Sequence, residues 1–295
     1  MLKQRIITAL VLAPLALASI FFLPLELFPV FAALVTLLGA WEWGAFIPAH
    51  FEQQKPSAAT TKMYRVVFTL TLTLLLVSFM VLVPVDSLWL NGQLHPIYEA
   101  ALVIALIWWI ASTAMVFCYP KGQAFWQQSD FYKGLFGQLT LIPFWLGLIA
   151  LRSYGYSNDP MLGAFLIMMV FGIVWGADVG AYFVGRSLGK RKLMPNVSPG
   201  KTLEGMLGGV ATAMAVVFLA QSYFYNIELH LLMLLGLFAA LASVFGDLSE
   251  SMFKRSSSIK DSGTLLPGHG GVLDRIDSLT AAIPLFALGY FFLVA

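Results

Sequence analysis

The sequence contains little charge, four histidines and one cysteine, and these shortages exclude several classes of protein. Only 11% of its 295 residues are Asp, Glu, Lys or Arg, whereas a soluble domain is about 25% charged. The net charge of +2 is too small to indicate a nucleic-acid partner. The single Cys118 excludes an intramolecular disulfide and argues against a cysteine-based metal cluster. No Ser–His–Asp or Cys–His pattern of nucleophile and base is present either.

Hydrophobic residues make up 59% of the chain, against roughly 45–50% in soluble domains, so lipid must be its solvent. A membrane-spanning helix needs about 20 mostly apolar residues. Nine segments meet this need, at about 6–25, 27–46, 66–86, 99–118, 134–151, 161–185, 204–223, 229–249 and 277–294. The first could instead be a signal peptide, but its apolar run continues through Phe22 and favours a retained span. We expect an all-α integral membrane protein with about nine transmembrane helices.

The Lys and Arg residues test this topology independently. With the N-terminus in the cytoplasm, all of the 17 except Arg152 fall on the cytoplasmic side. This bias is the positive-inside rule, and a wrong number of spans would scramble it. The pattern predicts a cytoplasmic N-terminus and an outer C-terminus, and we expect the membrane to be the bacterial inner (plasma) membrane.

The chain divides unevenly into two regions. Residues 1–160, with about five spans, have polar loops without dense motifs. Residues 161–295, with about four spans, hold nearly all the unusual polar residues. No internal repeat occurs, and no linker is long enough to separate a soluble domain. We therefore expect the chemistry in the second region, built from helix ends and short loops on the cytoplasmic face.

The densest polar segment is residues 251–277, between two long apolar spans. It holds three Asp, four Lys or Arg and one His, in a chain that is only 11% charged. Its position between two spans predicts a place at the membrane surface. Cations and carboxylates at this density suit a divalent metal ion and phosphates better than they suit packing.

Four polar residues form one stripe at the end of the preceding span. Asp247, Glu250, Ser251 and Lys254 are spaced i, i+3, i+4 and i+7, so they share a helix face. A solvated helix end with a salt bridge would explain Lys254 and Arg255. It does not explain Asp247, which lies at the edge of an apolar helix and is a functional candidate.

Asp274 and Asp277 stand near the start of the last span. Aspartate is favoured at helix N-termini, and capping accounts for one of the two. It does not account for both together with Arg275 and the preceding His-Gly-Gly. Mg²⁺ prefers oxygen ligands, commonly one or two carboxylates with substrate phosphates and water. Asp247, Asp274 and Asp277 could supply such ligands from two helix ends.

Span six carries a charge that the bilayer should not tolerate freely. Asp178 lies in its cytoplasmic half, and Tyr182 follows one turn later on the same face. We favour a functional role for Asp178 over a structural hydrogen bond. Gly172, Gly176 and Gly180 repeat every four residues, which predicts close packing against another helix.

The loop after span six ends in S-P-G-K-T. Gly-Lys-Thr suggests a P-loop, but that motif needs a Gly where this chain has Pro195, and no strand is expected before it. We reject the P-loop. Ser198, Lys201 and Thr202 remain candidates for a phosphate cradle, because the backbone N–H groups of a helix start favour anions.

Several other polar residues stay ambiguous in the sequence. Arg191 and Lys192 fit anchors to anionic lipid, and Glu204 fits a capping pattern. His269 lies in P-G-H-G-G, where glycines allow close backbone approach, and it either contacts phosphate or holds the loop. Glu42 in A-W-E-W-G is an intramembrane charge to which the sequence assigns no role.

Residues 251–277 resemble, position for position, the signature of the phosphatidate cytidylyltransferases, also called CDP-diacylglycerol synthases. That signature is S-x-x-K-R, four residues, K-D, and then H-G-G-x-x-D-R-x-D. The matching positions are Ser251, Lys254-Arg255, Lys260-Asp261, His269-Gly270-Gly271, Asp274-Arg275 and Asp277. Residues 175–186 and 198–205 also look like this family. The resemblance is strong over roughly 161–295, whereas residues 1–160 resemble the family only in hydropathy.

The resemblance implies transfer of CMP from CTP to phosphatidate, giving CDP-diacylglycerol and pyrophosphate in phospholipid biosynthesis. It also implies a homodimer, Mg²⁺ on Asp247, Asp274 and Asp277, and a second, monovalent cation such as K⁺. Asp178 and Tyr182 would orient the site or bind that second ion. The expected catalytic residues are Lys254, Lys260, Arg275, Asp274 and Asp178. The expected substrate-binding residues are Ser198, Lys201, Thr202, Ser251, Arg255, His269, Gly270 and Gly271.

Two other functions compete with this interpretation. A CTP-dependent polyprenol or phytol kinase has similar chemical needs but would release CDP instead of pyrophosphate. A cation-coupled transporter could use intramembrane Asp178 and Asp247, but transporters place their sites near the bilayer midplane. Here the polar residues gather at one surface. A CDP-alcohol phosphotransferase is disfavoured because no D-G-x-x-A-R segment with spaced aspartates occurs.

Overall fold

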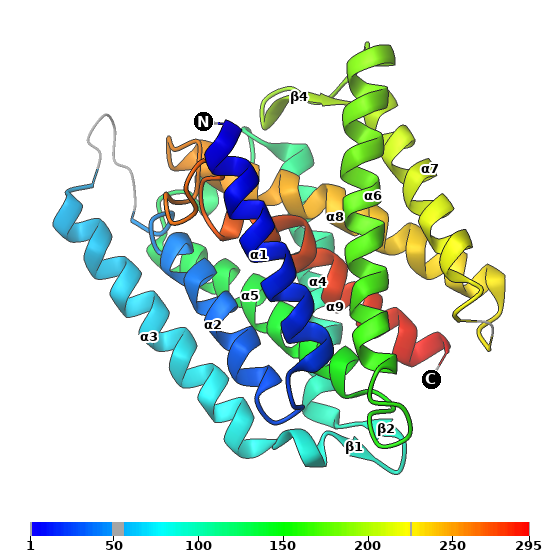
Figure 1. Ribbon diagram of the computed structural model, residues 1–295. Helices are drawn as coiled ribbons and strands as arrows, with labels where there is room; N and C mark the ends of the chain where they lie inside the picture. Colours follow the sequence, from blue (N-terminus) through cyan, green and yellow to red (C-terminus); the bar gives the residue numbers. More distant parts are fainter. Residues whose placement is uncertain (1, 49–55, 225, 295) are drawn as a thin grey trace.

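The computed structural model describes residues 2–48, 56–224 and 226–294, with the backbone alone for residues 2–7 and 9. Nine α-helices make up most of this part of the chain (Figure 1). They are α1 (Leu2–Phe22), α2 (Phe28–Trp43), α3 (Ala58–Leu82), α4 (Pro96–Cys118), α5 (Asp130–Ser153), α6 (Leu162–Leu188), α7 (Leu203–Ala220), α8 (Leu229–Ser256) and α9 (Leu273–Leu293).

Seven of these helices, α3 to α9, are long and apolar enough to cross a membrane. The apolar parts of the other two are shorter: α2 has 16 residues, and the apolar stretch of α1 within its described side chains is Leu10–Phe22. The chain is therefore a multi-pass integral membrane protein, as predicted. Each of the nine predicted spans overlaps one helix, and seven of these helices meet the length and composition that a crossing requires.

The helices extend further than hydropathy indicates at the polar segment. α8 continues to Ser256 and α9 begins at Leu273, whereas the sequence placed these span ends near 249 and 277. The reason is that a helix need not stop where its residues become polar, because its backbone hydrogen bonds are internal. The stripe from Asp247 to Lys254 is therefore helical throughout, and Asp274 lies in the first turn of α9.

Glycines bring α6 and α7 into close contact along their length. A Cβ atom on Gly180 would lie 2.7 Å from the carbonyl oxygen of Gly208 and would overlap the hydroxyl of Thr212. One on Gly176 would lie 3.0 Å from a methyl group of Val216. The predicted glycine packing face is confirmed.

The core joins the two regions of the chain. α5 is buried over most of its length and packs against α6 and α9, while α4 packs against α8 and α9. The large buried aromatic side chains Trp43, Trp126 and Phe253 lie in this core, with ring centroids of Trp43 and Trp126 5.0 and 5.2 Å from that of Phe253. α3 lies at the periphery and exposes Leu70, which suits contact with lipid tails.

Arg152, the exception to the charge bias, is buried inside the protein. Only 2% of it is exposed, and its guanidinium donates hydrogen bonds to the carbonyl oxygens of Ile20 (2.8 Å), Leu23 (3.4 Å) and Pro160 (3.0 Å). It satisfies carbonyl groups around the end of α1, which have no partner within that helix. Its position is explained by packing, so it does not contradict the topology.

Two small antiparallel sheets were not expected from the sequence. One pairs β1 (Trp89–Leu90) with β2 (Gln93–Leu94) through Asn91 and Gly92, whose positive φ angles of 53° and 83° suit a tight hairpin turn. The other pairs β3 (Lys192–Met194) with β4 (Ser198–Thr202) at the opposite end of the bundle (Figure 1). β4 leads directly into α7 and so carries Lys201 to the start of that helix.

Candidate active site

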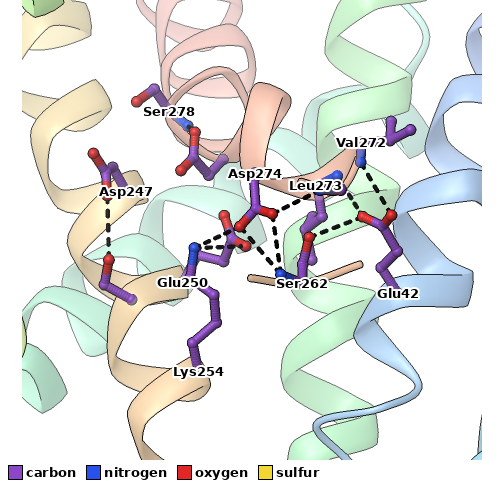
Figure 2. Close-up of polar contacts among 12 residues, drawn as sticks. Glu42, Asp247, Glu250, Lys254, Ser262, Val272, Leu273, Asp274 and Ser278 are labelled. Carbon is purple, nitrogen blue, oxygen red and sulfur yellow. Dashed lines mark hydrogen bonds and ion pairs between the residues drawn. The ribbon is translucent and has the colours of Figure 1, made fainter. Parts of the chain in front are cut away.

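The end of α8 and the start of α9 hold a carboxylate cluster, which we define as Asp247, Glu250, Asp274 and Asp277 with the ammonium of Lys254. α8 and α9 pack against each other, which brings the two ends of the signature together. Figure 2 shows Glu250, Lys254 and Asp274 pointing toward one another between the helices. The stripe and the aspartate pair, which the sequence predicted to act together from two helix ends, therefore meet at one site.

Lys254 is the central cation of the cluster. Its Nζ lies 2.7 Å from Oδ1 of Asp274 and 3.3 Å from Oε1 of Glu250. Only 4% of the Glu250 side chain is exposed, and neither of its oxygens accepts a hydrogen bond in the described part of the chain. Its neighbour is a second carboxylate, that of Asp277. The Lys254 ammonium thus balances the charge of more than one carboxylate in a buried environment.

Asp274 binds both the loop that precedes α9 and the ammonium of Lys254. Its Oδ2 accepts hydrogen bonds from the backbone N–H groups of Gly271 (2.8 Å) and Ser262 (3.0 Å). Both donors precede α9, so the capping interpretation is wrong for this aspartate, which holds the preceding loop instead. Asp277 differs, because its carboxylate accepts a hydrogen bond from the N–H of the adjacent Ser278 (2.7 Å). Its carboxylate also neighbours that of Glu250.

Asp247 connects the cluster to the loop after α6. Its Oδ2 lies 2.6 Å from Nζ of Lys201, and its Oδ1 accepts a hydrogen bond from the Ser251 hydroxyl at 3.3 Å. The sequence assigned Lys201 and Asp247 to different functions, phosphate and metal. In the structure they are in direct contact.

A cavity of about 380 Å³ lies beside this ion pair, between α6, α7 and β4. The predicted residues Asp178, Tyr182, Lys201 and Thr202 all line it, together with Arg186. Arg186 donates a hydrogen bond to the Tyr182 hydroxyl at 2.8 Å. Asp178 and Tyr182 therefore share a face, as predicted, and that face borders the cavity.

The start of α7 is shaped by two side chains. Thr202 is its N-cap and accepts a hydrogen bond from the N–H of Gly205 at 3.1 Å. Glu204 does not complete that cap; its carboxylate accepts from the N–H groups of Lys190 and Arg191 and pairs with the Arg191 guanidinium at 2.9 Å. Arg191, interpreted above as a lipid anchor, is therefore tied to α7.

Several predicted substrate-binding residues lie at the edges of the site. Ser198 is on β4, and Arg255 donates to the carbonyl oxygen of Val197 at 3.3 Å. Arg275 is exposed on the first turn of α9. Lys260 lines a different hollow, next to Glu42. Lys260, which the sequence predicted to be catalytic, therefore does not line the same cavity as Lys201.

The His-Gly-Gly turn precedes α9. The N–H of His269 donates to the carbonyl oxygen of Leu266, and Leu266 and Gly270 form a short bridge. Gly270 has a φ of +84°, which disfavours any side chain there. Nδ1 of His269 is buried without a hydrogen-bond partner in the described residues. The backbone contacts shape this turn, and Nδ1 of the imidazole takes no part in them.

Sequence reasoning missed the partner of Glu42. Its carboxylate accepts hydrogen bonds from the Ser262 hydroxyl (2.9 Å) and the N–H groups of Val272 (3.1 Å) and Leu273 (2.8 Å), as Figure 2 shows. Its status as an intramembrane acid was the signal that it mattered. Its partner could not be found because the contact joins positions 230 apart.

Comparison with known proteins shows to which family this chain belongs. The model of the cytidylyltransferase family matches residues 3–293. The chain belongs to the cytidylyltransferase family. The phosphatidate cytidylyltransferase of Haemophilus influenzae is 41% identical over 300 residues, covering 100% of both chains. That of Pseudomonas aeruginosa is 46% identical over 291 residues, covering 97% of this chain and 96% of its own.

The likeness to the cytidylyltransferase family extends beyond the predicted region. The phosphatidate cytidylyltransferase of Bacillus subtilis is 40% identical over 155 residues, half of this chain and 55% of its own. The two full-length relatives cover residues 1–160 as well, where the sequence alone showed only similar hydropathy. The resemblance inferred from the signature is confirmed and applies to the whole chain.

The donor chemistry of the cluster fits Mg²⁺, although the side chains do not form a ready-made cage. In the described part of the chain, no group of three or more His, Cys, Asp or Glu side chains is placed to hold a metal ion. Mg²⁺ commonly takes one or two carboxylates and completes its shell with phosphates and water. The adjacent carboxylates of Glu250 and Asp277 repel each other unless a cation or a proton lies between them.

Proposed function

We propose that this protein is a phosphatidate cytidylyltransferase. It transfers CMP from CTP to phosphatidate and produces CDP-diacylglycerol and pyrophosphate for phospholipid biosynthesis. The names of its full-length relatives support the reaction. The observation that carries the proposal is the Lys201–Asp247 ion pair, which joins the cavity beside α6 to the carboxylate cluster. A nucleotide in the cavity would have its phosphates next to the acidic residues.

The chain's own residues supply phosphate binding and orientation. In the reaction, an oxygen of the phosphatidate phosphate attacks the α-phosphorus of CTP, and the bond to the β-phosphate breaks to release pyrophosphate. A phosphomonoester has a second pKa of about 6, so it is already largely ionised at neutral pH and needs no general base. Lys201 and Lys254 neutralise phosphate charge, and Asp247 and Asp274 hold these lysines in place.

We assign the divalent ion to Asp247, Asp274 and Asp277, and the buried carboxylate of Glu250 beside Asp277 is a further candidate ligand. When bound, Mg²⁺ would neutralise charge on the triphosphate. Asp178 faces the cavity and is available to orient the site or to take part in binding a monovalent ion such as K⁺. Lys260, Arg275, Ser198, Arg255 and His269 remain proposed phosphate or lipid contacts at the rim.

The proposed topology places the N-terminus and the active site in the cytoplasm and the C-terminus outside, across a bacterial inner membrane. Three points support it: the charge bias, the buried role of Arg152, and the position of β4 at the end of the bundle opposite β1 and β2 (Figure 1). Nine crossings require α1 and α2 to span with the other seven. The homodimer stays a prediction of the family resemblance.

The test uses purified full-length protein in detergent with CTP and phosphatidate, with and without Mg²⁺. We expect Mg²⁺-dependent formation of CDP-lipid with one pyrophosphate released per lipid formed. Release of CDP without CDP-lipid would replace the proposal with the lipid-kinase function. Folded protein that consumes no CTP with varied lipids would contradict both and direct attention to cation-driven transport.

A further inference from the structure

We infer that Glu42 is a positioning residue of the active site, acting through the start of α9 and the signature loop. Glu42 lies on α2, in the region where the sequence predicted no chemistry. Only 1% of it is exposed, and it has no ion pair with a basic side chain among the described residues. A buried carboxylate without a cation is costly unless strong hydrogen bonds replace water. Its partners therefore reveal what it does.

Its partners are the first donors of α9. The first N–H groups of a helix have no acceptor within the helix. The N-cap of α9, Val272, has no side chain that can cap. Glu42 accepts from the N–H of Val272 at 3.1 Å and of Leu273 at 2.8 Å instead. A carboxylate is favoured here by charge-assisted hydrogen bonds and by the partial positive charge of a helix N-terminus.

Ser262 couples this cap to the carboxylate cluster. Its hydroxyl donates to Glu42 at 2.9 Å, while its N–H donates to Asp274 at 3.0 Å. Figure 2 shows Ser262 between the two carboxylates. Glu42 and Asp274 thus hold the same loop residue, and Gly271, which donates to Asp274, directly precedes the helix start that Glu42 holds. A displacement of Glu42 would move the backbone that orients Asp274, and with it the ion pair of Asp274 with Lys254.

Two glycines make room for Glu42. A Cβ atom on Gly263 or on Gly271 would overlap the Glu42 carboxylate, and one on Gly271 would also overlap the Ser262 hydroxyl. The second glycine of His-Gly-Gly is therefore required by close approach to a residue on α2. Gly270, in contrast, is required by its φ of +84°. The contact explains a signature position that the catalytic cluster alone does not.

The kinetic test of this inference rests on the proposed function. Hydrogen–deuterium exchange does not, because it reports on the backbone hydrogen bonds directly. We would compare wild type with Glu42→Gln, which keeps the shape but places an amide N–H₂ against N–H donors. Ser262→Ala removes one bond and serves as a milder second variant. Glu26→Gln, at an exposed turn before α2, is the matched control. The measurements are kcat, KM for CTP, melting temperature, and hydrogen–deuterium exchange of the peptide covering 262–273.

For Glu42→Gln we expect kcat to fall by about tenfold or more, with KM for CTP changed by less than about threefold. Exchange should accelerate in residues 262–273, and Ser262→Ala should show both effects more weakly. Unchanged exchange in this peptide, or wild-type kcat with faster exchange, would overturn the inference. If Glu42→Gln does not fold, Ser262→Ala decides between these outcomes. If wild type makes no CDP-lipid, the proposed function fails, and exchange still tests the cap.

Discussion

Two buried charges from the first region of the chain, Glu42 and Arg152, hold opposite kinds of helix end. Glu42 accepts hydrogen bonds from the N–H groups at the start of α9. Arg152 donates to the carbonyl groups around the end of α1. Both satisfy groups that a helix leaves unpaired at its ends. The guanidinium of Arg152, however, donates to the carbonyl oxygens of Ile20, Leu23 and Pro160 and not to the carboxylate cluster, whereas Glu42 shares Ser262 with Asp274.

The difference between Glu42 and Arg152 separates a role in folding stability from a role in turnover. A buried charge that ties helices far from the cluster should matter for folding alone. One that ties the backbone of the cluster should matter for turnover as well. The variants below test that separation, beginning with the cluster itself.

Asp274→Asn should have the largest effect. The amide cannot balance the charge of Lys254, from which Asp274 lies 2.7 Å away, and it can place an N–H₂ against two backbone donors. We expect turnover to fall by about a hundredfold or more in folded protein. Steady-state kinetics and a melting curve check this. Substantial activity in well-folded Asp274→Asn protein would contradict the assignment of Asp274 to the metal and phosphate site.

Gly271→Ala should come next, because it disturbs Glu42 and Ser262 from the opposite side. The added methyl group would overlap both, so we expect turnover to fall by roughly tenfold to a hundredfold. Gly134→Ala on α5 is the control, since a Cβ there meets nothing within 4 Å. Equal activities of the two variants would contradict the close approach between the signature and α2.

Lys201→Met should reduce kcat/KM for CTP by about tenfold, because the cavity would lose its contact between phosphate and ammonium and Asp247 would lose its partner. Lys201→Arg should retain part of the activity, since it keeps the charge in a different shape. A full CTP titration separates KM from kcat. An unchanged kcat/KM for Lys201→Met would remove the cavity from the proposed nucleotide site.

Arg152→Met should leave turnover nearly unchanged and lower the melting temperature by about 5 °C. Methionine fills the buried space but removes three hydrogen bonds to carbonyl groups. Thermal melting in detergent and the specific activity of the folded fraction check both parts. A large loss of turnover in folded Arg152→Met protein would contradict the claim that Arg152, unlike Glu42, matters for folding stability alone.

The sequence predicted what depends on local periodicity. Nine apolar segments anticipate nine helices because burial in lipid imposes a continuous apolar run on each. The stripe of Asp247, Ser251 and Lys254 follows from helical spacing alone. The glycine face of α6 was found in the same way.

Contacts between distant segments could not be predicted from the sequence. Glu42 was conspicuous as a charge in an apolar helix, but nothing local connects it with Leu273, 231 positions away. The ion pair of Lys201 with Asp247 depends on how α7 packs against α8. The short sheet of β3 and β4 was missed because strands of three and five residues carry too little periodicity.

The most direct test of the central claim follows two phosphorus labels of CTP in separate reactions with purified protein and phosphatidate. Transfer of CMP predicts that label at the α-phosphorus enters the lipid, while label at the γ-phosphorus leaves as pyrophosphate. Entry of the γ-label into lipid, with the α-label retained in CDP, would contradict the account and establish phosphoryl transfer instead.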